Sequence, residues 1–162
     1  MIEIVPFSKE NAIGAIAVWN KVITDGRAFP QSEPFSIEDG VKFFEGQTFT
    51  GVAIDTENGD VVGVYILHPN FVGRCSHICN TSYAVNSTRR GQGIGEKIVT
   101  HSFQKARECG FKVLQLNAVI ASNTPALNLY KKLGMTPLGA IKDGFLNIDG
   151  EYEDIIPHYI NL

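Results

Sequence analysis

Four stretches of the chain combine apolar residues at helical spacing with residues that favour the start or the end of a helix. In the first, apolar residues recur every three or four positions after Ser8, a good helix cap. Gly110 and Gly134 follow the last two stretches, and glycine permits the left-handed conformation that ends many helices. The predicted helices are Ser8 to about Ile23, Ser36 to about Phe44, Gly93–Cys109 and Pro125–Leu133, with Ser8, Ser36 and Thr124 as caps.

Shorter apolar stretches between these helices have the length and composition of strands. Residues 57–59, Glu-Asn-Gly, are typical of a hairpin turn between two of them. Residues 25–34 contain one glycine and two prolines and are expected to be irregular. The order of predicted elements, β-α-α-β-β-β-α-β-α-β-β, predicts a mixed α/β sheet. The predicted strands are Ile2–Val5, Thr50–Asp55, Asp60–Leu67, Cys75–Val85, Val113–Ala118, Leu138–Ile141 and Tyr152–Ile160.

Length and composition are those of an ordinary globular protein. The chain has 162 residues, which predicts one domain over residues 1–162. Apolar residues make up 44% and charged residues 19%, which excludes a disordered or fibrous protein. The formal net charge is −3, so we expect neither a nucleic acid nor an anionic membrane as a partner.

The apolar runs and the cysteines predict where the protein resides. The longest runs, Ile13–Trp19 and Val61–Leu67, are far shorter than the roughly 18 residues that span a bilayer. The first residues show no secretion signal. Three cysteines, an odd number, fit a reducing compartment. We therefore expect a cytoplasmic protein.

The segment Arg90–Gly95, with the sequence Arg-Gly-Gln-Gly-Ile-Gly, follows a predicted strand and opens a predicted helix. Glycines let the backbone approach a ligand closely. The first amides of a helix have no partner within the helix and carry the positive end of its dipole. This combination predicts a seat for an anion, most naturally a phosphate.

Two well-known phosphate motifs do not match the segment. A P-loop requires Gly-Lys-Ser/Thr, whereas residues 95–98 are Gly-Glu-Lys-Ile. A dinucleotide fingerprint requires a third glycine where Glu96 stands, and a βαβ unit that starts the fold. Three alternating glycines would also be a costly way to form a simple turn, because glycine loses the most chain entropy on ordering.

Two motifs together resemble the GCN5-related N-acetyltransferase (GNAT) family. The family's central motif is Arg/Gln-x-x-Gly-x-Gly/Ala, and Arg90–Gly95 matches it. About thirty residues downstream the family has Asn-x-x-Ala, an aromatic residue and a Leu-Gly pair. Residues 123–135 have that pattern, with Tyr130 as the aromatic residue. The resemblance implies a central, mostly antiparallel twisted sheet of about seven strands flanked by about four helices.

The resemblance also implies acetyl-CoA as the acetyl donor and direct transfer in a ternary complex, without a metal. In that family the diphosphate rests on the glycine loop and the pantetheine arm pairs with the strand before it. A backbone N–H near Ala84 or Val85 would polarise the thioester carbonyl, and Tyr130 would protonate the departing thiolate. The residues implied for acetyl-CoA are Tyr83, Ala84, Val85, Arg90, Gly91, Gln92, Gly93, Ile94, Gly95, Asn123 and Tyr130.

Residues 69–80 resemble a segment of the fungal acetyltransferases that act on proline analogues such as azetidine-2-carboxylate. By this resemblance Asn80, Asn117 and Asn123 line the site, and Asn80 and Asn117 hold or orient the substrate. Arg27 and Phe29 lie in the irregular segment that usually covers the acceptor pocket in this family, and Arg27 or Arg74 is expected to pair with a substrate carboxylate. Glu33, Glu45, His77 and a chain of water molecules are the open alternatives for a base.

Cys75, His77 and Cys79 alternate along a predicted strand, but no fourth ligand is evident, so we expect no metal. The prediction is an N-acetyltransferase for a small-molecule amine, an amino acid or a proline-like analogue. The alternatives are acetylation of a protein N-terminus or lysine, and a non-catalytic CoA-binding sensor. The family resemblance also implies a possible homodimer.

Overall fold

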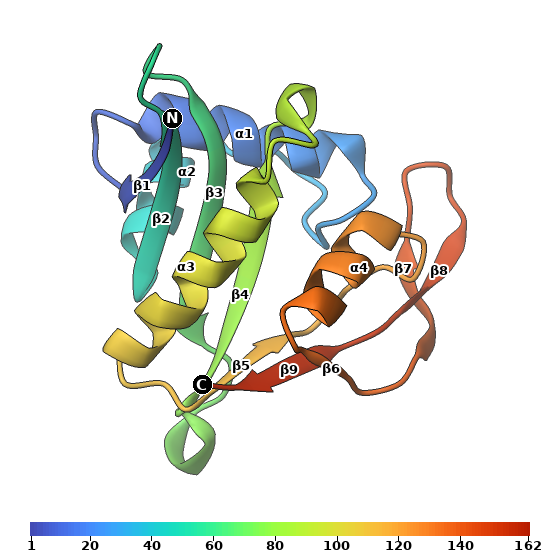
Figure 1. Cartoon of the computed structure of the whole chain (residues 1–162). Helices are drawn as coiled ribbons and strands as arrows, with labels where there is room; N and C mark the ends of the chain where they lie inside the picture. Colours follow the sequence, from blue (N-terminus) through green and yellow to red (C-terminus); the bar gives the residue numbers. More distant parts are fainter.

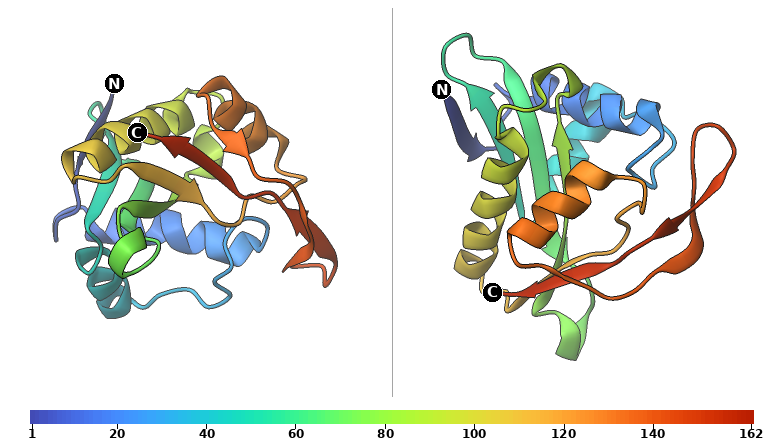
Figure 2. Two further views of the ribbon diagram at one scale, coloured as in Figure 1. Left: turned by 90° about the horizontal axis from the view of Figure 1, so that it is seen from below. Right: turned by 45° about the vertical axis from the view of Figure 1, so that its right-hand side comes forward.

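The computed structural model describes residues 1–162, which form a twisted central sheet between two layers of helices (Figures 1 and 2). The helices are α1 (Ala12–Asp25), α2 (Ile37–Glu45), α3 (Ile94–Glu108) and α4 (Thr124–Lys132). The strands are β1 (Ile2–Pro6), β2 (Phe49–Asp55), β3 (Val61–Pro69), β4 (Ile78–Val85), β5 (Val113–Leu116), β6 (Thr136–Pro137), β7 (Ile141–Leu146), β8 (Tyr152–Ile155) and β9 (His158–Asn161).

The main sheet has seven strands in the order β1-β2-β3-β4-β5-β9-β6, and β7 with β8 forms a separate hairpin. Every pair in the main sheet is antiparallel except β4 with β5. The expected fold class, a mostly antiparallel sheet of seven strands with four helices, is confirmed.

Each face of the sheet is buried by its own helices. One apolar cluster joins α1 and α2 to the sheet around Trp19, whose side chain is fully buried. The other joins α3 and α4 to the opposite face around Ile98 and Leu114. Figure 2 shows these two layers on opposite sides of the sheet. Apolar burial on both faces explains why β3 reads as a nearly continuous apolar run rather than as an alternating one.

The caps show where local patterns predicted the helix starts well and where they did not. Ser36 caps α2 as expected, because its side chain accepts a hydrogen bond from the Asp39 N–H at 3.1 Å. Ser8 was the wrong cap for α1, which begins after Asn11. The Asn11 side chain accepts from the Ser8 N–H at 2.9 Å, so these residues form a turn before the helix. Thr124 was also wrong, since Asn123 caps α4.

Three strand predictions were too long, the smallest error being Val113–Ala118, which ends at Leu116 in the structure. The predicted strand Cys75–Val85 begins only at Ile78, because residues 73–75 form a short 3-10 turn. Cys75 and His77 therefore do not lie on a strand with Cys79. The predicted strand Tyr152–Ile160 is two strands, β8 and β9, interrupted at Pro157. Residues 138–140 of the predicted strand Leu138–Ile141 lie between β6 and β7, and only Ile141 belongs to a strand, β7.

The strands β4 and β5 pair over only three residues each, Ile78–Asn80 with Val113–Gln115. Beyond Asn80 the edge of β4 has no neighbouring strand, so the sheet is split between β4 and β5. This split positions the candidate site.

Candidate active site

The glycine loop at the start of α3 exposes a run of free backbone amides. Gly91 and Gly93 have positive φ angles of 77° and 72°, and Gly93 is the residue before the first turn of α3. None of the N–H groups from Gly91 to Glu96 donates a hydrogen bond to another group of the protein. α3 has 15 residues, so the positive end of its dipole adds to these amides. The loop has the donors that a diphosphate requires.

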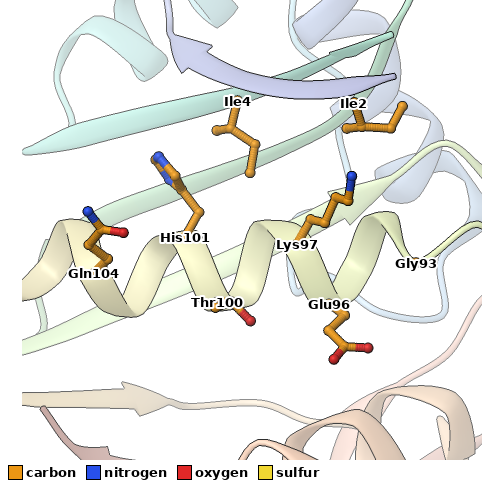
Figure 3. Close-up of a pocket in the computed structure, with 8 residues that line it drawn as sticks. All are labelled: Ile2, Ile4, Gly93, Glu96, Lys97, Thr100, His101 and Gln104. Carbon is orange, nitrogen blue, oxygen red and sulfur yellow. The ribbon is translucent and has the colours of Figure 1, made fainter.

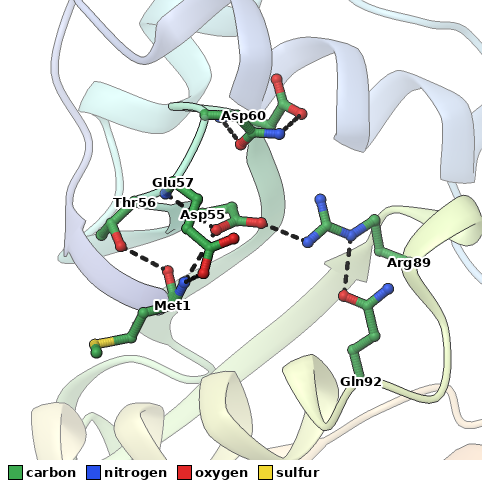
Figure 4. Close-up of polar contacts among 8 residues, drawn as sticks. Met1, Asp55, Thr56, Glu57, Asp60, Arg89 and Gln92 are labelled. Atoms are coloured by element: carbon green, nitrogen blue, oxygen red, sulfur yellow. Dashed lines mark hydrogen bonds and ion pairs between the residues drawn. The ribbon is translucent and has the colours of Figure 1, made fainter.

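Arginine side chains on the two sides of this loop have different roles. Arg89 forms an ion pair with Asp55 at 2.6 Å, and its Nε donates to the side chain of Gln92 at 3.0 Å (Figure 4). Hydrogen bonds from Arg89 and from the Glu57 N–H lower the pKa of Asp55 to about 2. Arg90 is exposed and belongs to no ion pair of the structure, so its guanidinium remains available to a phosphate.

The open edge of β4 presents a second set of backbone groups. The Asn70 N–H donates to Ile78 O and the Asn86 N–H donates to Val62 O, which fixes the hydrogen-bonding register of β3 with β4. Because alternate residues of an antiparallel strand face the same neighbour, Ala84 points its N–H and C=O at β3. Those of Tyr83 and Val85 point to the split. The family resemblance implied that a backbone N–H near Ala84 or Val85 polarises the thioester carbonyl. Because the Ala84 N–H faces β3, only the Val85 N–H of these two is directed to the split.

A cleft of about 190 Å³ occupies the split; we call it the β4–β5 cleft. The Thr81 hydroxyl is buried there without a hydrogen-bond partner. Residues of both faces of the sheet line the cleft, because the edge of β4 has no paired strand from Thr81 onward. Its lining is Ala28, Phe29, Pro30, Asn80, Thr81, Ser82, Tyr83, Leu116, Asn117, Ala118, Val119, Ile120, Asn123, Ala126 and Tyr130.

Tyr130 extends from α4 into the lining of this cleft. Its ring lies between the ring of Tyr83, with centroids 6.4 Å apart, and that of His158, with centroids 5.7 Å apart. Burial raises the pKa of Tyr130 to about 12. The phenol is therefore protonated at neutral pH and able to donate a hydrogen bond into the cleft.

The asparagines predicted for the site hydrogen-bond to other protein groups. The Asn80 side chain is buried and donates to the Gln115 carbonyl at 3.1 Å. Asn117 directly follows β5 and exchanges two hydrogen bonds with Asn70, at 2.8 and 3.2 Å. Asn123 accepts from the Ala126 N–H at 3.3 Å as the cap of α4. All three predicted asparagines line the β4–β5 cleft, so the structure brings them together.

The irregular segment after α1 contributes Phe29 to the cleft but not Arg27. Phe29 is buried against Trp19, with ring centroids 4.5 Å apart. Arg27 forms an ion pair with Asp149 in the turn between β7 and β8. Arg74 is exposed in the 3-10 turn before β4, away from the cleft lining.

None of the residues considered as a base lies in the cleft. Glu33, Glu45 and His77 are exposed, and the cleft lining contains no carboxylate and no histidine. Each of the three side chains lies on an exposed loop or helix end, outside the cleft lining. Sequence reasoning missed Asn70, which pairs with Asn117 from 47 positions away, and His158, which is buried beside Tyr130. No local pattern signals either contact.

A second, larger cavity of about 630 Å³ lies between β1 and α3 (Figure 3). Its lining is Ile2, Ile4, Gly93, Glu96, Lys97, Thr100, His101 and Gln104. It contains neither Tyr130 nor any predicted asparagine. Size alone therefore does not identify the site, whereas the β4–β5 cleft combines the open strand edge with a protonated phenol.

The structure contains no group of three or more His, Cys, Asp or Glu that could hold a metal ion. No helix is long and apolar enough to cross a membrane.

Comparison with known proteins places the chain in a family. The sequence model described as "Acetyltransferase (GNAT) family" matches residues 17–135, which is more than half of the chain. The chain therefore belongs to the acetyltransferase (GNAT) family. The family match includes the glycine loop and Tyr130, the two features on which the resemblance was based.

Three similar proteins show how widely the likeness extends. N-acetyltransferase aca1 of Schizosaccharomyces pombe is 37% identical over 83 residues, which are 51% of this chain and 40% of that protein. The L-amino acid N-acyltransferase MnaT of Escherichia coli is 26% identical over 79% of this chain and 76% of its own. The phosphinothricin acetyltransferase Pat of Sinorhizobium meliloti, solved with AcCoA, has a TM-score of 0.91 at 17% identity, covering 99% of this chain and 88% of that chain.

The match to aca1 spans less than half of that relative's length. The match to Pat shows the fold alone, because its sequence identity is only 17%.

Proposed function

We propose that the chain transfers the acetyl group of acetyl-CoA directly to the amine of a small molecule, an amino acid or a proline-like analogue. The observation that carries this proposal is the convergence of three features at one split of the sheet. These are the free amides of residues 91–96, the open edge of β4 and the protonated phenol of Tyr130. MnaT acts on L-amino acids and Pat on phosphinothricin, which is also a small amine.

The backbone provides the binding groups for the acetyl donor. The amides of Gln92, Gly93, Ile94 and Gly95 hold the diphosphate, and the exposed guanidinium of Arg90 adds positive charge beside it. The open backbone groups of Tyr83 and Val85 pair with the pantetheine arm as a further strand would. Acetyl-CoA supplies an acetyl group activated as a thioester.

The transfer forms a bond between the amine nitrogen and the carbonyl carbon, and breaks the bond between that carbon and sulfur. The Val85 N–H is the donor placed to polarise the carbonyl oxygen. Tyr130 donates a proton to the departing sulfur and recovers one from water, so that both the thiol and the phenol end neutral, the form that burial favours. The amine loses its proton to water, because the cleft lining contains no base.

Asn80, Asn117 and Phe29 form the acceptor side of the cleft in this proposal. The two amides orient the amine or hold a carboxylate, and neither can act as a base. A cleft of about 190 Å³ is small beside the roughly 300–1,000 Å³ of drug-sized ligand pockets. This size supports a small acceptor over a protein N-terminus or a lysine side chain, and Tyr130 supports an enzyme over a non-catalytic CoA sensor.

The test is thiol release from acetyl-CoA with a panel of free amino acids, azetidine-2-carboxylate and short peptides. We expect turnover with at least one free amino acid or proline analogue, and little with the peptides. Turnover only with peptides would favour the protein acetyltransferase, and acetyl-CoA binding without any turnover would favour the sensor. Tyr130→Phe is the control that separates enzymatic from spontaneous release.

We also propose that the chain forms a homodimer through the region around the β7–β8 hairpin. Large apolar side chains that are exposed gather there: Leu138, Ile141, Leu146, Ile148 and Tyr152. Sedimentation velocity at micromolar concentrations tests this proposal. A monomer that persists at all concentrations would contradict it.

A further inference from the structure

The turn at the end of the β7–β8 hairpin contacts the loop that follows α1. The Ile148 N–H donates to the Gly26 carbonyl at 3.0 Å, and Arg27 forms an ion pair with Asp149. Gly26 has a φ of 63°, and a Cβ on it would lie 2.7 Å from the Cβ of Ile148. The contact is therefore both polar and close-packed, and it joins segments more than 120 residues apart.

The same hairpin is attached at its other side to the segment before α4. The carboxylate of Glu153 accepts hydrogen bonds from the Ser122 hydroxyl and from the Asn147 side chain, the latter at 3.1 Å. These two bonds lower the pKa of Glu153. The Ala121 N–H also donates to the Asp154 carbonyl at 2.9 Å. Glu153 thus connects the hairpin to the residue that precedes Asn123.

The turn between these two attachments is itself held rigidly. Asn147 is buried, and its side-chain oxygen accepts from the N–H groups of Asp149 and Glu151 at 3.0 Å each. The Gly26 carbonyl is thus bonded to Ile148, whose neighbour Asn147 bonds Glu153, which in turn bonds Ser122. We call residues 147–153 the strap.

The strap connects the two walls of the acceptor side of the β4–β5 cleft. Residues 28–30, which follow Arg27 directly, form one wall. Residues 119–120 and Asn123, on either side of Ser122, belong to the other. An outward movement of either wall would stretch the contacts that the strap makes beside it.

Resting on the proposed function, we propose that the strap determines acceptor specificity. It holds the two walls at the separation that leaves about 190 Å³, and so restricts the acceptor to free amino acids and similar amines. Arg27 acts through the strap, as a positioning residue, and does not contact the substrate. The exposed ion pair of Arg27 with Asp149 contributes little to stability by itself. Glu153, which has two side-chain partners, is therefore the stronger point of attachment of the strap.

Glu153→Gln tests the strap with little change in shape. The two bonds end on different oxygens of the Glu153 carboxylate, and the amide keeps only one of these oxygens and loses the negative charge that strengthens both bonds. The readout is the ratio of kcat/KM for the best free amino acid of the panel to kcat/KM for the tripeptide that begins with it. We expect this ratio to fall at least about tenfold, mainly through the KM values of the amines, while KM for acetyl-CoA stays within about twofold.

A charge reversal provides an independent test if Glu153→Gln does not fold. Arg27→Asp should lower the same ratio about threefold, and the double reversal Arg27→Asp with Asp149→Arg should restore it. Lys42→Gln, which removes an exposed ion pair with Glu38 on α2, should leave the ratio unchanged. Amide exchange of Ile148 should become faster in Arg27→Asp and not in Lys42→Gln.

The outcomes separate the strap from the proposed function. An unchanged ratio in both strap variants, or a change in KM for acetyl-CoA alone, would overturn the claim that the strap determines acceptor specificity. The proposed function would still stand, provided that the wild type turns over a free amino acid. Absence of turnover with every free amine would overturn the proposed function and the strap with it.

Discussion

The two sides of the β4–β5 cleft are built from different parts of the chain. The donor side consists of backbone: the free N–H groups of residues 91–96 and the open edge at Tyr83 and Val85. The acceptor side consists of side chains that hydrogen-bond to one another, such as Asn117 with Asn70. Substitution of a side chain leaves a backbone N–H in place, so backbone donors suit the acetyl donor, which does not vary. Side chains can be substituted, so they suit the acceptor, which differs between relatives.

Gly93→Glu should have the largest effect, and only on the donor side. A carboxylate placed among the free amides repels the diphosphate, and we expect acetyl-CoA affinity to fall about 100-fold or more. Gly59→Glu is the matched control, because Gly59 also has a positive φ, 78°, and open space around it, but lies in the β2–β3 turn. Isothermal titration of both variants, with melting curves, separates this effect from backbone strain. Equal affinities in the two variants would refute the phosphate seat.

Tyr130→Phe should affect the chemical step at the meeting point of the two sides. We expect kcat to fall about 100-fold with KM for acetyl-CoA little changed, because the phenol donates a proton and contributes little to binding. Because the pKa of Tyr130 is raised to about 12, its protonated form persists across the alkaline range. The wild-type kcat should therefore not decline between pH 7 and 10. A decline centred near pH 9, or a wild-type kcat in the variant, would remove Tyr130 from the acid role.

Asn117→Ala should change the acceptor side alone, and by less. We expect KM for the amine to rise about tenfold, the equivalent of one lost hydrogen bond, with KM for acetyl-CoA unchanged. Asn70→Ala should act in the same direction, because Asn70 holds the Asn117 amide. Steady-state kinetics with both substrates varied provides the measurement. A change confined to acetyl-CoA would place Asn117 on the donor side.

Asp55→Asn should give the smallest effect, through the loop that precedes the free amides. Loss of the Arg89 ion pair should weaken acetyl-CoA binding about threefold and lower the melting temperature at pH 7. The folded-state pKa of Asp55, about 2, lies below its ordinary value, so its contribution is present above about pH 4 and is lost as the pH falls towards 2. Melting curves of the two proteins should converge over that range. A difference in melting temperature that stays constant as the pH falls towards 2 would show that the charge of the Asp55 carboxylate does not cause the difference in stability.

The same contrast explains what the sequence could predict. Ser36, the turn at residues 57–59 and the glycine loop act over a few positions, and the structure confirms the cap, the hairpin and the free amides. The split of the sheet could be expected only from the family resemblance, since pairing of β4 with β5 over three residues leaves no local pattern.

One failure of prediction was local, and the others came from contacts between distant residues. Ser8 has the composition of a cap, but Asn11 hydrogen-bonds its N–H and moves the helix start. Arg27 was expected to meet a substrate carboxylate, yet it faces Asp149, 122 positions away. His158 was not singled out as a site residue, yet it is buried beside Tyr130. Such pairings depend on the tertiary fold and not on neighbouring residues.

The most direct test of the account is a titration of the ¹⁵N-labelled protein with CoA, followed by amide NMR. Binding of the diphosphate to the front of α3 predicts that the amides of Gln92 to Glu96 shift most, followed by those of Tyr83 and Val85. The largest shifts at Ile2, Ile4 and His101, in the cavity between β1 and α3, with the glycine-loop amides unmoved, would contradict it.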